Sequence, residues 1–110
     1  MTIESLIGIG SAATALIIKK DAELNKRIGW DQNNLAAFVR DLKTHGRVEV
    51  GWRESCGSTD FTHLIYREWL KVLKLLRKDG MQISEERIKH GNSYATKKGG
   101  FWNSIVYIAE

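Results

Sequence analysis

The stretch DFTHLIYREWLKVLKLLRKDGMQI, residues 60–83, carries the strongest helix pattern in the chain. When it is placed on an α-helix at about 100° per residue, apolar and basic side chains separate onto opposite sides. The basic side is a line of residues three or four apart: His63, Arg67, Lys71, Lys74 and Lys78. The apolar side holds Ile65, Trp69, Val72, Leu73 and Leu76, with Tyr66 at its edge. The pattern predicts a helix of about 18 residues packed on a core.

Both ends of this helix carry recognisable signals. Residues 58–60 are Ser, Thr and Asp, whose side-chain oxygens are typical N-caps. Gly80 favours the left-handed conformation that ends many helices, and it follows two basic residues in the last turn.

The basic line has two interpretations. It could be a solvated face that keeps the protein soluble, but such a face usually mixes positive and negative charges. The one acid in the helix interior, Glu68, falls off the line. A line of cations can instead follow the phosphate backbone of a nucleic acid.

The whole chain sets broad limits on these interpretations. Its 110 residues are enough for one domain, and 43% hydrophobic and 27% charged residues are ordinary for a globular protein. The net charge of +4 permits a nucleic-acid partner without demanding one. The four tryptophans are most simply explained by packing in the core and on the sheet.

The cysteine and histidine content predicts neither a disulfide nor a metal site. Cys56 is the only cysteine, which fits a reducing cytoplasm. Together with His45, His63 and His90 it lacks the spacing of zinc ligands. The Gly-x-Gly-x-x-Ala run over residues 8–13 lacks the preceding strand of a dinucleotide loop, so no cofactor is predicted.

The N-terminal segment MTIESLIGIGSAATALIIKK, residues 1–20, is the most apolar part of the chain. Its uncharged run over residues 6–18 is too short to span a membrane, which takes about 20 residues. A signal peptide begins with a cation, but the first charged residue here is Glu4. Small residues four apart would allow close backbone approach. We therefore expect a buried or homodimerising helix within residues 1–29; membrane anchoring is the less favoured alternative.

The next segments read as a helix and a strand. Asp31 is a plausible N-cap for a helix over Gln32–His45, where apolar residues recur at helical spacing. The alternating run over 47–52 predicts a short strand, and 53–59 predicts a loop.

The C-terminal part predicts two strands. Residues 81–89 read as a strand with a bulge at residues 85–86, because the apolar alternation slips there. Residues 101–109 form the best strand pattern in the chain. We expect these two strands to form an antiparallel hairpin with a polar tip over residues 90–100. The tip and its border carry the basic residues Lys89, His90, Lys97 and Lys98.

This order of elements resembles a winged helix-turn-helix domain of the small phage and bacterial type, and LRKDGMQI over residues 76–83 resembles its junction between recognition helix and wing. The resemblance implies an α+β fold, with N-terminal helices followed by a winged-helix-like unit over 30–110 that holds a small three-stranded antiparallel sheet. It implies that the last helix enters the DNA major groove and that the hairpin tip acts as the wing. Arg67, Lys71 and Lys74 would then face DNA, with Lys97 and Lys98 at the wing tip.

One departure leaves an alternative open. A winged helix has two helices separated by a sharp turn before the wing, but residues 61–79 contain no helix breaker. Either a short first helix lies within 53–62, or one long helix crosses a three-stranded antiparallel sheet.

These features predict a small cytoplasmic DNA-binding protein, such as a phage or mobile-element transcriptional regulator, with double-stranded DNA as its partner. The expected contacts are His63, Arg67, Lys71, Lys74, Lys78, Lys89, Lys97 and Lys98, and Arg67 is suited to read a guanine edge.

Two other classes of function compete with DNA binding. A protein-binding module would be marked by an exposed apolar patch containing Trp30, Trp52 or Trp102. An enzyme is the weakest interpretation, because the candidate metal-nuclease residues lack the required spacing. Those candidates are Asp60, Glu85, Glu86 and Lys89.

Overall fold

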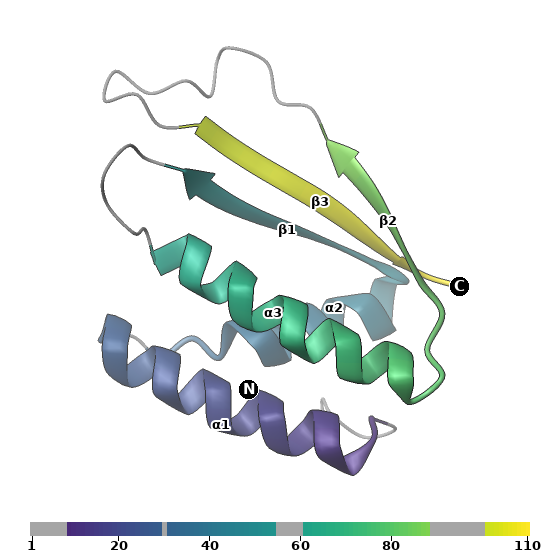
Figure 1. Ribbon diagram of the computed structural model, residues 1–110, viewed down its shortest axis with the longest axis horizontal. Coiled ribbons are helices and arrows are strands. Elements are labelled where there is room, and N and C mark those ends of the chain that lie inside the picture. The colour runs from purple at the N-terminus through teal and green to yellow at the C-terminus, as the bar shows by residue number, and fades with distance from the viewer. Residues whose placement is uncertain (1–8, 30, 55–60, 89–100) are drawn as a thin grey trace.

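The computed structural model describes residues 9–29, 31–54, 61–88 and 101–110, and the structural statements below concern these residues. They form an α+β fold of three helices and a three-stranded antiparallel sheet, which confirms the predicted class (Figure 1). The helices are α1 (Ser11–Ile28), α2 (Asn34–His45) and α3 (Phe61–Lys78). The strands are β1 (Arg47–Glu54), β2 (Ile83–Ile88) and β3 (Phe101–Ala109).

Strand β3 lies at the centre of the sheet, between β1 and β2, and both pairings are antiparallel. The predicted hairpin of the last two strands is therefore confirmed. The register places Val48 and Val50 opposite Tyr107 and Ile105, so these four side chains share one face. Ile83 joins that face opposite Ala109.

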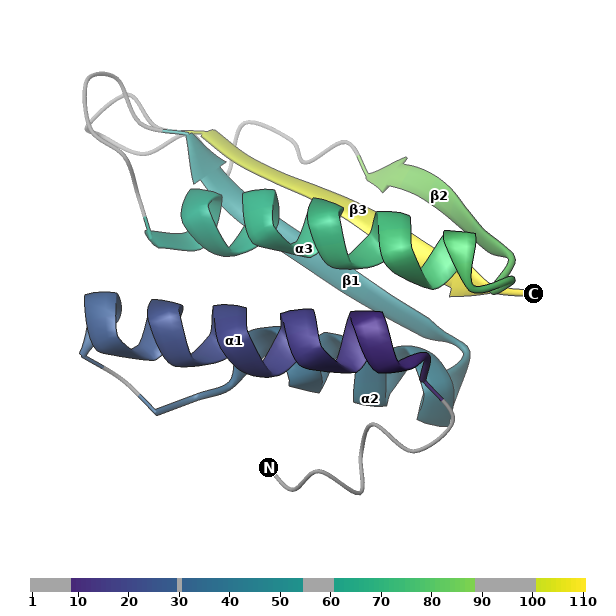
Figure 2. The same cartoon turned by 60° about the horizontal axis from the view of Figure 1, so that its bottom comes forward.

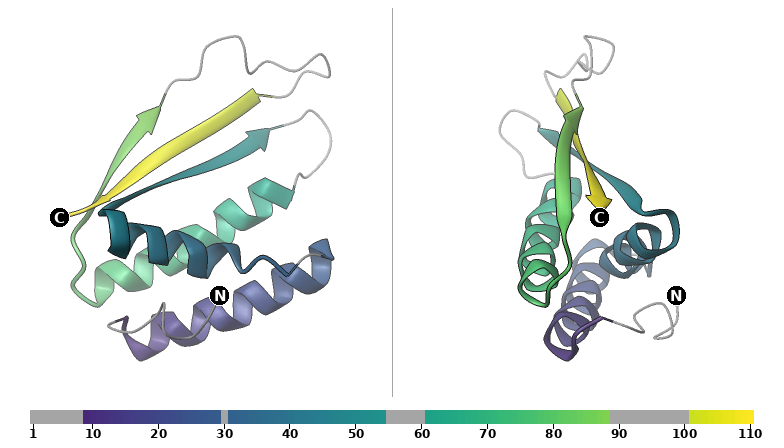
Figure 3. Two further views of the ribbon diagram at one scale, coloured as in Figure 1. Left: turned by 180° about the vertical axis from the view of Figure 1, so that it is seen from behind. Right: turned by 90° about the vertical axis from the view of Figure 1, so that its right-hand side faces the viewer.

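The helices lie on a single side of the sheet. Figure 2 shows α1 running alongside α3 with α2 behind α1, and the end-on view in Figure 3 shows α2 and α3 next to the sheet with α1 beneath both of them. Helix α1 runs against α2 and α3, so its apolar side is used within its own chain. Its buried residues are Ala13, Ile17, Asp21 and Leu24.

The core forms between the inner face of the sheet and the inward sides of α2 and α3. It is built from the side chains that the periodicity of each element turns inward, among them Leu35, Val39, Leu42, Val50, Trp69, Leu76 and Tyr107. Packing of this kind is the dominant stabilising contribution in a small domain.

Helix α3 runs from Phe61 to Lys78 without interruption and ends at Gly80, whose φ of 102° is left-handed. Its predicted length and buried side are confirmed, since Ile65, Trp69, Val72, Leu73 and Leu76 are all buried. One long helix crossing the sheet is the arrangement observed. A turn between two helices is absent from 61–78, and the predicted N-cap at residues 58–60 lies outside the described residues.

Several predicted boundaries need correction. Strand β1 continues through residue 54, because its pairing with β3 extends to Phe101. No bulge interrupts β2, whose register with β3 is continuous from Ile83 to Ile88. The apparent slip arises because Ile83 and Ile88 are an odd number of positions apart and so point to opposite faces.

Two apolar residues of β3 do not lie beneath α3. Val106 and Ile108 alternate with the inward-facing Ile105 and Tyr107, so they are on the outer face of the sheet. Val106 is buried but does not belong to the core cluster under the helices.

Helix α2 begins at Asn34 rather than Gln32, and its N-cap is Asn33 with a φ of 49° rather than Asp31. The cap side chain makes no capping hydrogen bond. Asp21 of α1 supplies the acceptors instead: its Oδ1 accepts from the Leu35 N–H at 2.9 Å and its Oδ2 from the Ala36 N–H at 3.0 Å. Residue 21 therefore caps a helix 14 residues further along the chain.

A bilayer could not be spanned by α1, α2 or α3, the helices of the described residues, because none of them combines the necessary length with enough apolar residues.

Candidate functional site

The solvent side of α3 carries the predicted cations. Arg67, Lys71, Lys74 and Lys78 are all exposed, and we refer to these four residues as the basic face. His63 lies on the same line at the start of the helix and is half-buried. From Arg67 to Lys78 the basic face extends about 16 Å along the helix.

The orientation of the basic face is fixed by the opposite side of α3. Trp69 is fully buried and makes edge-to-face contacts with Phe38 of α2 and Tyr107 of β3, at centroid distances of 5.4 and 5.6 Å. Contacts from two elements prevent the helix from rotating about its axis, since any rotation would expose the indole. The cations therefore remain directed to solvent.

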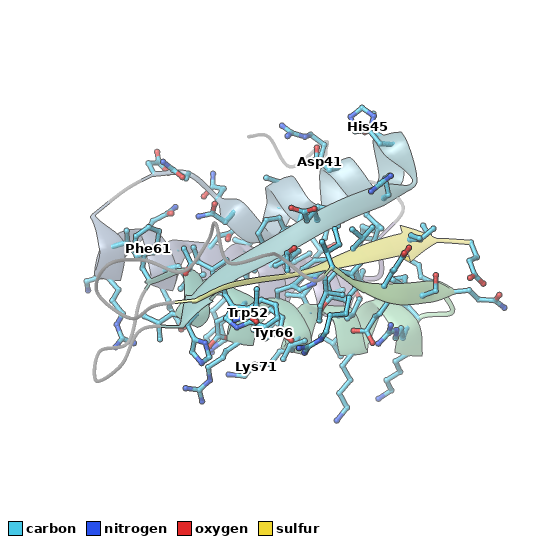
Figure 4. All side chains as sticks on the ribbon, turned by 90° about the horizontal axis from the view of Figure 1, so that it is seen from above. Asp41, His45, Trp52, Phe61, Tyr66 and Lys71 are labelled. Atoms are coloured by element: carbon cyan, nitrogen blue, oxygen red, sulfur yellow. The ribbon has the colours of Figure 1, made fainter. Side chains whose placement is uncertain are left out.

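A second aromatic contact anchors the first half of α3. Tyr66 stacks on Trp52 of β1, with 3.8 Å between ring centroids and 11° between ring planes (Figure 4). Trp52 is only 4% exposed. It is thus a packing residue and does not contribute to the exposed patch proposed for a protein-binding module.

The buried Tyr107 hydroxyl stands beside the same aromatic residues. Burial raises the pKa of Tyr107 above the ordinary range of tyrosine, and the neighbouring Tyr66 and Glu85 raise it further. The phenol therefore stays neutral at physiological pH.

The ion pairs divide the basic face into two parts. Lys71 Nζ lies 3.2 Å from Glu68 Oε1, so one cation has an internal partner. Arg67, Lys74 and Lys78 form no salt bridge with any residue in the described ranges. Three exposed cations are available to an external anion.

Glu68 also reaches across to α1, where its Oε2 lies 3.5 Å from Lys20 Nζ. Lys20 in turn donates a hydrogen bond to Glu23 at 3.3 Å. This hydrogen bond, together with the charge of Glu68, raises the pKa of Lys20, so its ammonium group remains charged. A chain of alternating charges therefore connects α1 to the edge of the basic face.

Arg77 belongs to a different part of the surface. Its guanidinium donates to the Ile83 carbonyl at 2.8 Å and lies 3.9 Å from Glu85. It ties the last turn of α3 to the start of β2, and this role as a structural tie removes it from the set of free cations.

Two cavities border α3 in the described part of the chain. One of about 80 Å³ lies between α1 and α3, well below the about 300 Å³ of the smallest ligand pockets. Another of about 480 Å³ lies between the start of α1 and the end of α3, and among the described residues Asp79 is the one charged side chain that lines it. A side chain at residue 10, beside that cavity, would collide with the Asp79 carboxylate.

The remaining predicted site residues do not join the basic face in the part of the chain that is described. The proposed wing lies outside the described residues, together with its cations Lys89, Lys97 and Lys98. The same holds for Asp60, Cys56 and Trp30. Glu85 and Glu86 are adjacent on β2 and point to opposite faces of the sheet, so they do not converge. Within 9–29, 31–54, 61–88 and 101–110, no three His, Cys, Asp or Glu side chains are grouped to hold a metal ion.

The sequence pattern missed the partnership between Glu68 and Lys20. Glu68 is visible as the single acid off the basic line, and Lys20 follows the apolar run of residues 6–18. Nothing local connects them, because the antiparallel packing of α1 on α3 creates the pair.

Comparisons with models of known families, with curated proteins and with solved structures found no match.

Proposed function

We propose that the protein is a small DNA-binding protein that holds the phosphate backbone through the basic face of α3. The observation that carries the proposal is the line of exposed cations on a helix whose opposite side is fixed in the core. Three of these cations, Arg67, Lys74 and Lys78, have no ion-pair partner among the described residues.

The dimensions of the basic face suit a duplex. Over the about 16 Å from Arg67 to Lys78, double-stranded DNA presents roughly ten phosphate charges. Each cation can therefore find a phosphate without any change in the backbone of α3. Contacts of this kind supply affinity and depend strongly on salt, whereas sequence preference requires contacts with base edges.

The winged-helix interpretation adds a finer mode of binding. It would place α3 in the major groove and residues 89–100 against the backbone as a wing. The order α2, β1, α3, β2, β3 supports it, whereas the uninterrupted α3 does not supply the turn between two helices. Binding through the basic face is thus the better-supported part of the proposal, and regulation of transcription is its proposed biological setting.

The test is a fluorescence anisotropy titration against a labelled duplex of mixed sequence at two salt concentrations. The double variant Lys74→Ala/Lys78→Ala should weaken binding and lower the salt slope by roughly 2. A matched control is Lys19→Ala/Lys26→Ala, which removes the same charge from exposed positions on α1. Equal effects of the two double variants, or no salt-dependent binding by the unaltered protein, would refute the proposal.

The alternative function, a protein-binding module, is favoured by one observation. Leu70 is 39% exposed and lies beside Arg67 and Lys74 on α3. An acidic partner with an apolar side chain could use this mixed surface. Leu70→Ser would then weaken binding to that partner, whereas it should leave phosphate-backbone binding unchanged.

A further inference from the structure

The carboxylate of Glu68 occupies an unusual position between the two helices. Its side chain is 20% exposed, and its two oxygens face different cations: Lys71 at 3.2 Å on the same helix and Lys20 at 3.5 Å on α1. Oε2 is buried and has no hydrogen-bond partner. The group is thus held mainly by two flexible ammonium ends.

The packing of α1 on α3 has other sources of stability. Ala13, Ile17 and Leu24 of α1 are buried in the core without any help from Glu68. Lys20 also keeps a second partner, Glu23, at 3.3 Å. Releasing Glu68 from its cations would therefore leave the interface between the two helices in place.

We propose that Glu68 is an internal counter-ion of the basic face, which the phosphate backbone of a nucleic acid must displace from Lys71. This inference rests on the proposed function and adds a selection rule to it. The rule is that the basic face accepts a dense row of negative charges and rejects an isolated carboxylate.

The rule follows from competition for one ammonium group. A single carboxylate that approaches Lys71 gains nothing, because Glu68 already occupies that position with the same chemistry. A phosphate backbone engages Arg67, Lys74 and Lys78 at the same time, and these contacts do not displace any internal partner among the described residues. Only then does exchange at Lys71 become favourable, since the chain of phosphates is already held in place.

The central experiment compares the unaltered protein with Glu68→Gln, using as probes a labelled mixed-sequence duplex and a labelled peptide that carries a single glutamate among uncharged residues. Removing the negative charge that lies 3.2 Å from Lys71 Nζ should raise duplex affinity by about three- to tenfold. The salt slope should become steeper by roughly one phosphate contact. The single-glutamate peptide should gain more affinity than the duplex in relative terms, because discrimination against an isolated carboxylate is lost.

Two controls separate this role from a general effect of charge. Glu23→Gln removes the same charge from a nearby acid on α1, which forms a salt bridge with Lys20 and none with Lys71, so it should change duplex affinity by less than about twofold. Combining Glu68→Gln with Lys71→Ala should remove most of the gain. Thermal melting of each variant checks that the fold is retained.

A second measurement keeps the inference testable even if Glu68→Gln fails to fold. Lys71→Gln should weaken duplex binding less than Lys74→Gln, because Lys71 must first give up Glu68. Equal losses for Lys71→Gln and Lys74→Gln would overturn the role of Glu68. A folded Glu68→Gln variant with unchanged or lower duplex affinity would overturn it too. In both cases, salt-dependent binding by the unaltered protein would still support the proposed function. If the unaltered protein does not bind duplex DNA, both proposals fail together.

Discussion

Two acidic side chains on the helices are held in contrasting ways. Asp21 on α1 is 4% exposed, and its carboxylate accepts hydrogen bonds from two backbone N–H groups at the start of α2. Glu68 on α3 is held by the ends of two lysine side chains, one of which is 57% exposed. Both residues connect one helix to another, but only Asp21 has donors that are fixed in space.

The difference separates a structural charge from an exchangeable one. The N–H groups of Leu35 and Ala36 are part of α2 and have no other acceptor if Asp21 is removed, because the N-cap side chain of Asn33 makes no capping bond. An ammonium group can instead turn toward water or another anion at little cost. We therefore expect substitutions of Asp21 to alter stability and substitutions of Glu68 to alter binding.

The largest effect should come from Asp21→Ala, which leaves two buried N–H groups without an acceptor. We expect a loss of about 2–4 kcal/mol in the free energy of unfolding, measured by chemical denaturation. Glu68→Ala is the comparison, with an expected loss below about 1 kcal/mol. Similar losses in the two variants would show that both carboxylates are structural.

The next largest effect is expected on the preference of the protein for particular DNA sequences. If Arg67 reads a base edge, Arg67→Ala should cost about 1–3 kcal/mol for duplexes that carry the preferred base and little for others. Lys74→Ala should instead weaken binding to every duplex by a similar factor. The measurement is a competition titration with a set of duplexes that differ at single positions, and uniform losses for both variants would assign Arg67 to phosphate contact.

A smaller effect concerns pH. Burial raises the pKa of Asp21, and the hydrogen bonds from Ala36 and Leu35 only partly offset this. The Asp21 carboxylate therefore binds a proton more tightly in the folded state than in the unfolded state. Its contribution to stability is full below the ordinary aspartate pKa of about 4. That contribution is lost as pH rises through the raised pKa of the folded state.

We test this with Asp21→Asn, which does not titrate. The difference in unfolding free energy between the unaltered protein and Asp21→Asn should grow in favour of the unaltered protein as pH falls from about 7 to about 4. The opposite trend would show that the backbone hydrogen bonds outweigh burial.

The smallest effect on folding is expected at Ile18, which is 46% exposed on the outward side of α1. Ile18→Glu should change folding stability by less than about 0.5 kcal/mol. If residues 1–29 form a homodimer as predicted, the same substitution should shift sedimentation toward the monomer. An unchanged dimer would move the interface away from this side of α1.

The contrast between local and distant interactions explains how much the sequence could predict. The buried side of α3, the basic face and β3 all follow from periodicity within one element, which a single segment of sequence contains. The cap on α2 and the Lys20–Glu68 pair were missed because they join residues that only the packing of α1 brings together. The prediction of a bulge in β2 was wrong because it rests on the positions of the apolar residues alone. As an edge strand, β2 directs Glu85 and Arg87 to the helix side of the sheet, where both remain exposed.

The position of β3 at the centre of the sheet has a consequence for synthesis on the ribosome. Both other strands pair with β3, and Glu54 and Arg47 meet Phe101 and Ile108, which follow them by 47 and 61 residues in the chain. Until residues 101–109 leave the exit tunnel, β1 and β2 have no partner in this sheet, and the apolar side of α3 has no Tyr107 to pack against. Pairings over such distances form slowly, so the nascent chain should spend an interval in which it depends on chaperones or on the early packing of α1 with α2.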